Sequence, residues 1–235
     1  MISKIAHVTS VIILFILVMF FPACGLVYTI DGTYYYSPWG ASIDSNGCMG
    51  VDSNSDGRKD MSVRYTLELK TENMTYTKES FSDTLCATLD STIISQSTYT
   101  TGAYISSKRI YYDSSADEYK TWSDEPVQAL AMDITYVSSA LTCKSDSCVI
   151  AYSSLAKLNS CENGSLTVDQ EYDYTACEFK DQPATLYSLV YKNNFNEIVF
   201  GAKYVLTTDS VTEYAGDSDA NRYKYLLVNF RYSQK

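Results

Sequence analysis

Histidine is almost absent from this sequence: His7 is the single one in 235 residues, and it precedes a hydrophobic run near the N-terminus. If that segment is removed, no imidazole remains, which excludes Ser-His-Asp and Cys-His mechanisms and histidine ligation of zinc. Chemistry that uses carboxylates alone, such as glycoside hydrolysis, stays open. The sequence therefore predicts a protein that is not an enzyme, with a carboxylate-based hydrolase of envelope glycans as the catalytic alternative.

Proline and long hydrophobic runs are scarce as well. The chain has four prolines and no proline- or glycine-rich linker, which indicates a single folded domain. The longest apolar run, residues 8–23, is shorter than the ~20 residues that a membrane-spanning helix needs. With Lys4 before it and Ala23 at its end, this run has the charged, apolar and small-residue parts of a secretory signal peptide.

Cys24 follows this run directly, after the small residue Ala23. A small residue and a cysteine at the end of an apolar segment resemble the signal of bacterial lipoproteins. The resemblance implies that residues 1–23 are removed, that Cys24 bears the lipid anchor, and that residues 24–30 tether the protein to a membrane. Gly25, rather than an aspartate, implies the outer membrane of the cell envelope by the same resemblance.

An ordinary signal peptide of a secreted protein is the alternative. Asn73 and Asn163 would then be glycosylation acceptors, because each begins an Asn-x-Ser/Thr triplet. In both cases the chain is exported, and its cysteines meet an oxidising compartment.

Acidic residues outnumber basic ones. Residues 1–23 contain one lysine and no acidic residue, so the remaining 212 residues carry 17 basic and 28 acidic side chains, a net charge of −11. A surface this acidic disfavours nucleic acid and anionic lipid as partners, and it suits cation binding.

Cysteine is present in an odd number, seven, which requires an explanation in an exported protein. If Cys24 carries lipid, six remain, and all six can pair. The absence of a Cys-x-x-Cys pair argues against a metal site. Several connectivities are open, and proximity in the sequence favours three pairs: Cys48–Cys86, Cys143–Cys148 and Cys161–Cys177.

Strand-forming residues dominate the rest of the chain, which includes 22 tyrosines. Residues 63–70 alternate apolar and polar side chains, which predicts a half-buried strand, a three-residue loop at 71–73 and a returning strand from Met74. Further predicted elements are neighbouring strands at 98–106 and 108–113, a strand at 129–137, a hairpin of 185–192 and 197–206, a strand at 223–232, and a helical turn at 153–158.

Sequential antiparallel strands must protect their edges, either by closing into a barrel or by packing as two sheets. Gly32-Thr33-Tyr34 at the first strand and Arg231 in the last resemble the lipocalin pattern of Gly-x-Trp with an arginine packed over the aromatic ring. The resemblance implies an all-β fold, a single antiparallel β-barrel over residues 31–235; a β-sandwich is the alternative. It also implies a small apolar or amphipathic ligand inside the barrel. Tyrosines would line that space or simply fill the core.

Residues 52–60 read D-x-N-x-D-G-x-x-D, an alternation of oxygen-bearing side chains that can converge on one hard cation. The stretch resembles the calcium loops of EF-hands, dockerins and thrombospondin-type repeats, although Val63 stands where an EF-hand has its bidentate glutamate. The alternative is a solvated turn rich in Asp, Asn and Gly. The candidate ligands of a structural Ca²⁺ are Asp52, Asn54, Asp56, the backbone carbonyl of Arg58, and Asp60.

Together these features predict a membrane-anchored lipoprotein whose β-barrel binds a small ligand without catalysis. A structural or adhesive cell-surface module is the alternative, with the loops and the calcium site as its contact face.

Overall fold

The fold was analysed in a computed structural model that describes residues 29–36, 44, 46–53, 55–116, 118–161, 164–207, 210–213 and 216–234. Contacts divide the chain into two units, Met1–Ile30 and Asp31–Lys235, and all described helices and strands lie in the second. The predicted signal, the lipidation residue Cys24 and the glycosylation residue Asn163 lie outside the described residues.

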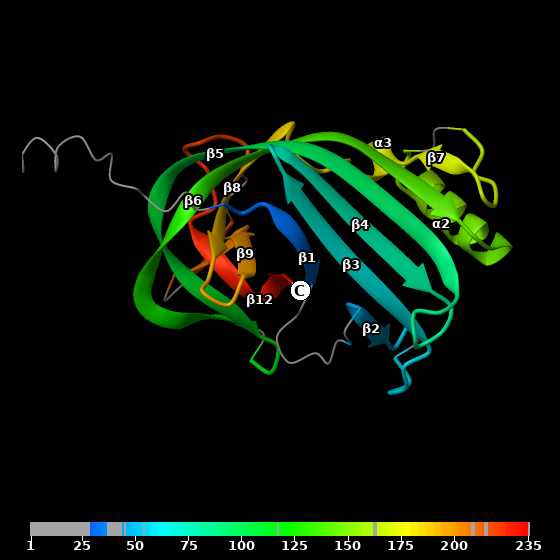
Figure 1. The fold of residues 1–235 in the computed structure, drawn as a ribbon, viewed down its shortest axis with the longest axis horizontal. Helices are drawn as coiled ribbons and strands as arrows, with labels where there is room; N and C mark the ends of the chain where they lie inside the picture. The colour runs from blue at the N-terminus through cyan, green and yellow to red at the C-terminus, as the bar shows by residue number, and fades with distance from the viewer. Residues whose placement is uncertain are drawn as a thin grey trace, which may run out of the picture. The chain divides into compact units, whose positions relative to one another are not determined.

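The second unit is all-β, built on one large mixed sheet with two short helices beside it (Figure 1). The elements in chain order are β1 (Gly32–Tyr36), β2 (Cys48–Val51), β3 (Met61–Lys70), β4 (Asn73–Phe81), β5 (Leu89–Asp113), β6 (Glu118–Cys143), α2 (Asp146–Leu158), β7 (Glu171–Asp173), α3 (Thr175–Glu178), β8 (Thr185–Lys192), β9 (Glu197–Ala202), β10 (Tyr204–Thr207), β11 (Ser210–Glu213) and β12 (Tyr225–Gln234).

Strand pairing follows the order β1-β12-β9-β8-β6-β5-β4-β3-β2, with β7 beside β6 and β10–β11 as a separate hairpin. Two further pairings link strands that are distant in this order. β1 pairs with β3 as well as with β12, so that Tyr34 has Leu67 on one side and Gln234 on the other. β12 also pairs in parallel with β5, where Leu226 lies opposite Arg109. The last strand of the chain therefore joins three others: β1, β9 and β5.

The β3–β4 hairpin confirms the alternation read from the sequence and corrects its loop. Val63, Leu67 and Leu69 are buried, whereas Glu68 and Lys70 are exposed. The turn has two residues rather than three. Thr71 and its neighbour Glu72 both have positive φ, 47° and 66°, the backbone twist of a type I′ hairpin turn. As a consequence Asn73 already belongs to β4, opposite Lys70.

β5 and β6 are each about four to five times as long as an ordinary strand, and they curve together away from β3 and β4 (Figure 1). The predicted strands 98–106 and 108–113 are not neighbours, because both belong to β5. The chain passes between them through register shifts near Thr101 and Ser107 rather than through a turn. Such bulges bend a strand, so β5 pairs with β4 in its first half and with β12 in its second.

The other predicted elements fall inside observed ones, with altered bounds. Residues 129–137 are strand, within β6, and 185–192 are β8. The single strand predicted at 197–206 is divided, because β9 ends at Ala202 and β10 begins at Tyr204. The last strand is shifted by two residues at each end, from the predicted 223–232 to β12.

α2 is a full helix of 13 residues where a single turn at 153–158 was predicted. It begins earlier because Ser145 caps it, with its hydroxyl accepting the amide of Cys148 at 3.1 Å. Val149 and Tyr152 then pack against a buried cluster that includes Ile93 and Leu141, and this tertiary packing stabilises the helix.

Three disulfides join the cysteines of the described ranges, and they confirm the pairs favoured by proximity: Cys48–Cys86, Cys143–Cys148 and Cys161–Cys177. The first ties β2 to the loop after β4. The second joins the end of β6 to the first turn of α2. The third joins the segment after α2 to α3, so the helical region between β6 and β8 is held at both ends.

Candidate ligand-binding site

A cavity of about 280 Å³ lies among the strands of the large sheet. Its walls come from β3, β4, β5, β6, β8, β9 and β12, together with α3 and the segment after it. An adjoining cavity of about 350 Å³ is lined by five aromatic residues and Met49. Tyr76 and Tyr232 line both spaces, so the two cavities share a wall.

Aromatic rings form a continuous cluster around the shared wall, named here the tyrosine cluster: Tyr36, Tyr65, Tyr76, Phe200, Phe230 and Tyr232. The rings of Tyr36 and Tyr65 meet edge to face at a centroid distance of 5.4 Å, and Tyr65 stacks on Tyr76 at 6.0 Å. Tyr232 lies 5.5 Å from Tyr36 and 5.9 Å from Phe200. Tyrosines therefore line a cavity here, which is one of the two uses that the sequence left open.

Burial raises the pKa of the tyrosine hydroxyls of this region. It raises the pKa of Tyr36 and of Tyr136 to about 12, with neighbouring tyrosines or acids adding to the effect. Burial also raises the pKa of Tyr76 and of Tyr232, further than that of Tyr36. At neutral pH the cavity wall thus presents uncharged hydroxyl groups, which can donate or accept hydrogen bonds to a bound molecule.

Glu178 is the single charged residue among those that line the 280 Å³ cavity. It ends α3, directly after Cys177, whose disulfide to Cys161 fixes this segment. The next residue, Phe179, stacks on Tyr136 with a centroid distance of 4.5 Å and so closes the wall beside the carboxylate.

The environment of Glu178 is poor in compensating groups. Burial raises the pKa of its carboxyl above the ordinary value, and the positive charge of Lys78 lowers it in part. Among the described residues, no side chain donates a hydrogen bond to this carboxylate and no cation lies in ion-pair contact with it. The sequence analysis missed Glu178. The sequence feature that could have indicated a site there is an acidic residue placed between a disulfide-forming cysteine and an aromatic residue.

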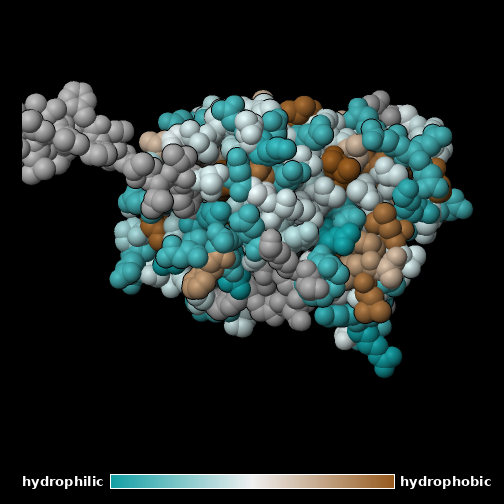
Figure 2. Space-filling view, in the orientation of Figure 1, coloured by the Kyte–Doolittle hydropathy of each residue, from teal (hydrophilic) through white to brown (hydrophobic). Residues whose placement is uncertain are grey.

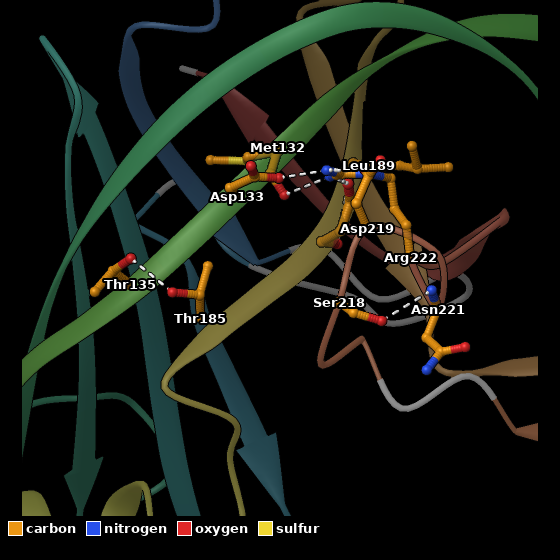
Figure 3. A network of polar contacts seen from close by, with 10 residues as sticks. Met132, Asp133, Thr135, Thr185, Leu189, Ser218, Asp219, Asn221 and Arg222 are labelled. Atoms are coloured by element: carbon orange, nitrogen blue, oxygen red, sulfur yellow. Dashed lines mark hydrogen bonds and ion pairs between the residues drawn. The ribbon is translucent and has the colours of Figure 1, made fainter.

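Arg222 fixes the loop next to Tyr223, which lines the cavity. Figure 3 shows the contact between Arg222 and Asp133. The side chain of Arg222 is buried, 7% exposed, and its Nη2 lies 2.6 Å from Asp133 and 2.7 Å from Asp219. Its Nη1 donates to the backbone carbonyls of Met132 and Ser188 at 3.3 and 2.9 Å. One guanidinium thereby connects the loop to both β6 and β8.

Gly201 allows this loop to approach the sheet closely. A Cβ at this position would lie 2.8 Å from the Cβ of Tyr223 and 3.0 Å from the backbone nitrogen of Leu189. Since neither neighbour can move freely, any side chain here would push the loop away from β9.

The predicted calcium loop is closed by its own hydrogen bonds. Asp52 accepts the amides of Asp56 and Gly57 at 3.2 and 2.7 Å, and Asp60 accepts both the amide and the hydroxyl of Ser53. The Ser53 bonds lower the pKa of Asp60. Asn54 lies outside the described residues. Within the part of the chain that the structure describes, no group of three or more acidic, cysteine or histidine side chains is arranged to hold a metal ion.

The residues of the lipocalin resemblance lie in β1 and β12. Tyr34 is fully buried in β1, and the ammonium of Lys192 lies 5.7 Å from its ring centroid. Arg231 is in β12 as predicted, and its Nη1 lies 3.5 Å from Glu197.

The outer surface is a mixture of hydrophilic residues and small apolar patches on the face shown in Figure 2. None of the helices in the described ranges combines the length and hydrophobicity required to cross a membrane. Comparison with known proteins gave no match to any family model or to any curated protein.

Proposed function

We propose that this protein binds a small amphipathic molecule inside a lipocalin-like, closed β-barrel and does so without catalysis. The observation that carries the proposal is the cavity, whose walls come from seven strands and which continues into the tyrosine cluster. Aromatic carbon offers apolar contact, while buried hydroxyl groups offer hydrogen bonds, which is the lining expected of a small-molecule pocket.

Strand pairing supports the closed form of the sheet. With β1 between β12 and β3, eight strands follow one another in a cycle: β1, β12, β9, β8, β6, β5, β4 and β3. Each neighbouring pair in this cycle is antiparallel. Eight strands enclose just enough room for side chains and one small ligand.

A neutral fluorescent probe, N-phenyl-1-naphthylamine, tests this proposal on the full-length protein. We expect saturable fluorescence enhancement with one site per chain. Ser97→Phe fills the cavity from the wall, because Ser97 is buried in β5 and lines it, and should abolish the enhancement. Ser106→Phe, at an exposed position on the same strand, is the matched control. Equal binding by both variants, or none by the wild type, would reject the proposal.

We also propose that Cys24 anchors the protein to the cell envelope through lipid, as the N-terminal sequence predicts. The mass of the mature N-terminal peptide decides the matter. A diacylglyceryl or triacyl group on Cys24 is the expected result. An unmodified N-terminus elsewhere would favour the secreted alternative.

The loop of residues 52–60 remains a proposed calcium site. Its carboxylates accept backbone amides, and a cation would have to share or replace those bonds. If Ca²⁺ binds, it should raise the melting temperature of the wild type by several degrees relative to chelator, and the shift should vanish in Asp56→Ala. Identical melting of the wild type in both conditions would leave the loop as a simple turn.

A further inference from the structure

We propose that the ligand of the 280 Å³ cavity is an organic cation, an ammonium group attached to an apolar body, whose positive charge is held by Glu178. This inference rests on the proposed function, and it names the chemical class of the ligand for the same site. Three features of the cavity lead to it.

The first feature is the charge of the wall. Of the residues that line the cavity, Glu178 alone carries a formal charge, and the others are aromatic, aliphatic, serine, glycine or glutamine side chains. Gln182 and the serines can donate hydrogen bonds, but none of them neutralises a carboxylate. The cavity as a whole is therefore negative by one charge.

The second feature is that the nearby cations do not neutralise the charge of Glu178. Arg222, the buried cation of the adjacent loop, is already paired with Asp133 and Asp219. Lys78 acts on Glu178 through its field, without an ion-pair contact. A partly buried carboxylate without a close partner is costly, and a ligand that supplies the missing positive charge recovers that cost on binding.

The third feature is the aromatic wall beside the carboxylate. Tyr136 and Phe179 form a stacked pair next to Glu178, and Tyr76 leads from there into the tyrosine cluster. Aromatic faces attract cations, and the attraction grows when water is excluded. The apolar body of the ligand would occupy the space between these rings, and the acidic net charge of −10 favours the approach of a cation from solution.

The test uses three ligands that share a phenyl group and a short chain: 2-phenylethylamine, 2-phenylethanol and 3-phenylpropanoate. Each competes with N-phenyl-1-naphthylamine for the full-length protein at pH 7. We expect the amine to bind about tenfold more tightly than the alcohol, and the carboxylate to bind more weakly than both. In Glu178→Gln the advantage of the amine over the alcohol should disappear while probe binding persists.

Glu171→Gln serves as the charge-matched control, because Glu171 is exposed on β7 and does not line the cavity. It should retain the preference for the amine. Equal affinities of amine and alcohol in the wild type would overturn the cation inference and leave the ligand-binding proposal intact. An amine preference that survives in Glu178→Gln would overturn the role of Glu178. Failure of the probe to bind would overturn the proposed function itself.

The pH dependence gives a second readout. Below the raised pKa of Glu178 the carboxyl is neutral, so the affinity for the amine should fall toward that of the alcohol as the solution is acidified. The other ionisable groups whose charges interact with it are Lys78, Tyr76, Tyr136, Tyr152 and Tyr174. Burial raises the pKa of each of these tyrosines, so their hydroxyls stay neutral through this range and the change is assigned to Glu178. A pH-independent amine affinity would contradict the inference.

Discussion

The two halves of the β5–β6 ribbon enclose interiors of opposite character. The first half of β5 presents Ser95 and Ser97 to the tyrosine-lined cavity. The second half contributes Ile105 to a filled aliphatic cluster, where Leu189 and Leu226 are fully inaccessible to solvent. Since one strand serves both regions, the difference arises from the side chains that face inward: small polar residues leave space, and branched aliphatic residues remove it.

The two regions differ in what they contribute: one stabilises the fold, and the other leaves room for a ligand. The aliphatic cluster joins β5, β6, β8, β9 and β12 and stabilises the region in which the parallel β5–β12 pairing occurs. The cavity region keeps a partly buried acid and unfilled space, both of which reduce stability and both of which a ligand can use.

Leu226→Ala should show the largest effect of this difference. It removes a fully buried side chain from the filled cluster, which costs about 3 kcal/mol in free energy of unfolding. Ser97→Ala on the cavity wall should change stability by less than about 0.5 kcal/mol, because no dense packing is lost there. Urea denaturation measures both, and similar costs would contradict the proposed contrast.

Arg222→Ala should have the next largest effect, a loss of about 2 kcal/mol, because it leaves Asp133 without its buried partner and frees the loop that carries Tyr223. Affinity for the neutral probe should fall with it. Asp219→Asn is the control: its side chain is 82% exposed, and its removal from the pair should cost little. Denaturation and probe titration on the same samples distinguish the two variants. If Arg222→Ala loses stability but keeps its affinity for the probe, the loop does not contribute to ligand binding.

Glu178→Gln should have the smallest effect, and with the opposite sign. Because burial raises the pKa of Glu178, the wild type gains stability at pH values below the ordinary carboxyl pKa and loses it as the pH rises through the raised value. At pH 7 the variant without ligand should therefore be more stable, by less than about 1 kcal/mol. Melting temperatures at pH 4 and pH 7 measure this. Lower stability of the variant at pH 7 would show that the carboxylate supports the fold.

Elements with local signals were predictable from the sequence. The alternation in residues 63–70, the Asn-rich turn between β8 and β9, and the cysteine pairs each depend on neighbours in the chain, and each is found in the structure. The type I′ turn at Thr71 and Glu72 was harder, because neither residue favours the positive φ that the paired strands impose there.

The features that form the site depend on distant contacts. No local sequence pattern indicates that β5 is one continuous strand. Its bulges interrupt the pattern in the sequence, and the chain stays extended through them because β5 pairs with β6 on both sides of each bulge. Glu178 becomes distinctive when α3 is brought against Tyr136, which lies 42 positions earlier in the chain. Arg222 likewise acquires its role from Met132 and Ser188.

The position of β12 has a consequence for how the protein folds. β12 is the last strand in the order of the described elements, yet β1, β5 and β9 all pair with it. Until β12 has been made, the chain lacks the strand on which both interiors depend, so neither interior can close. Such long-range pairing slows folding and leaves strand edges exposed in the meantime.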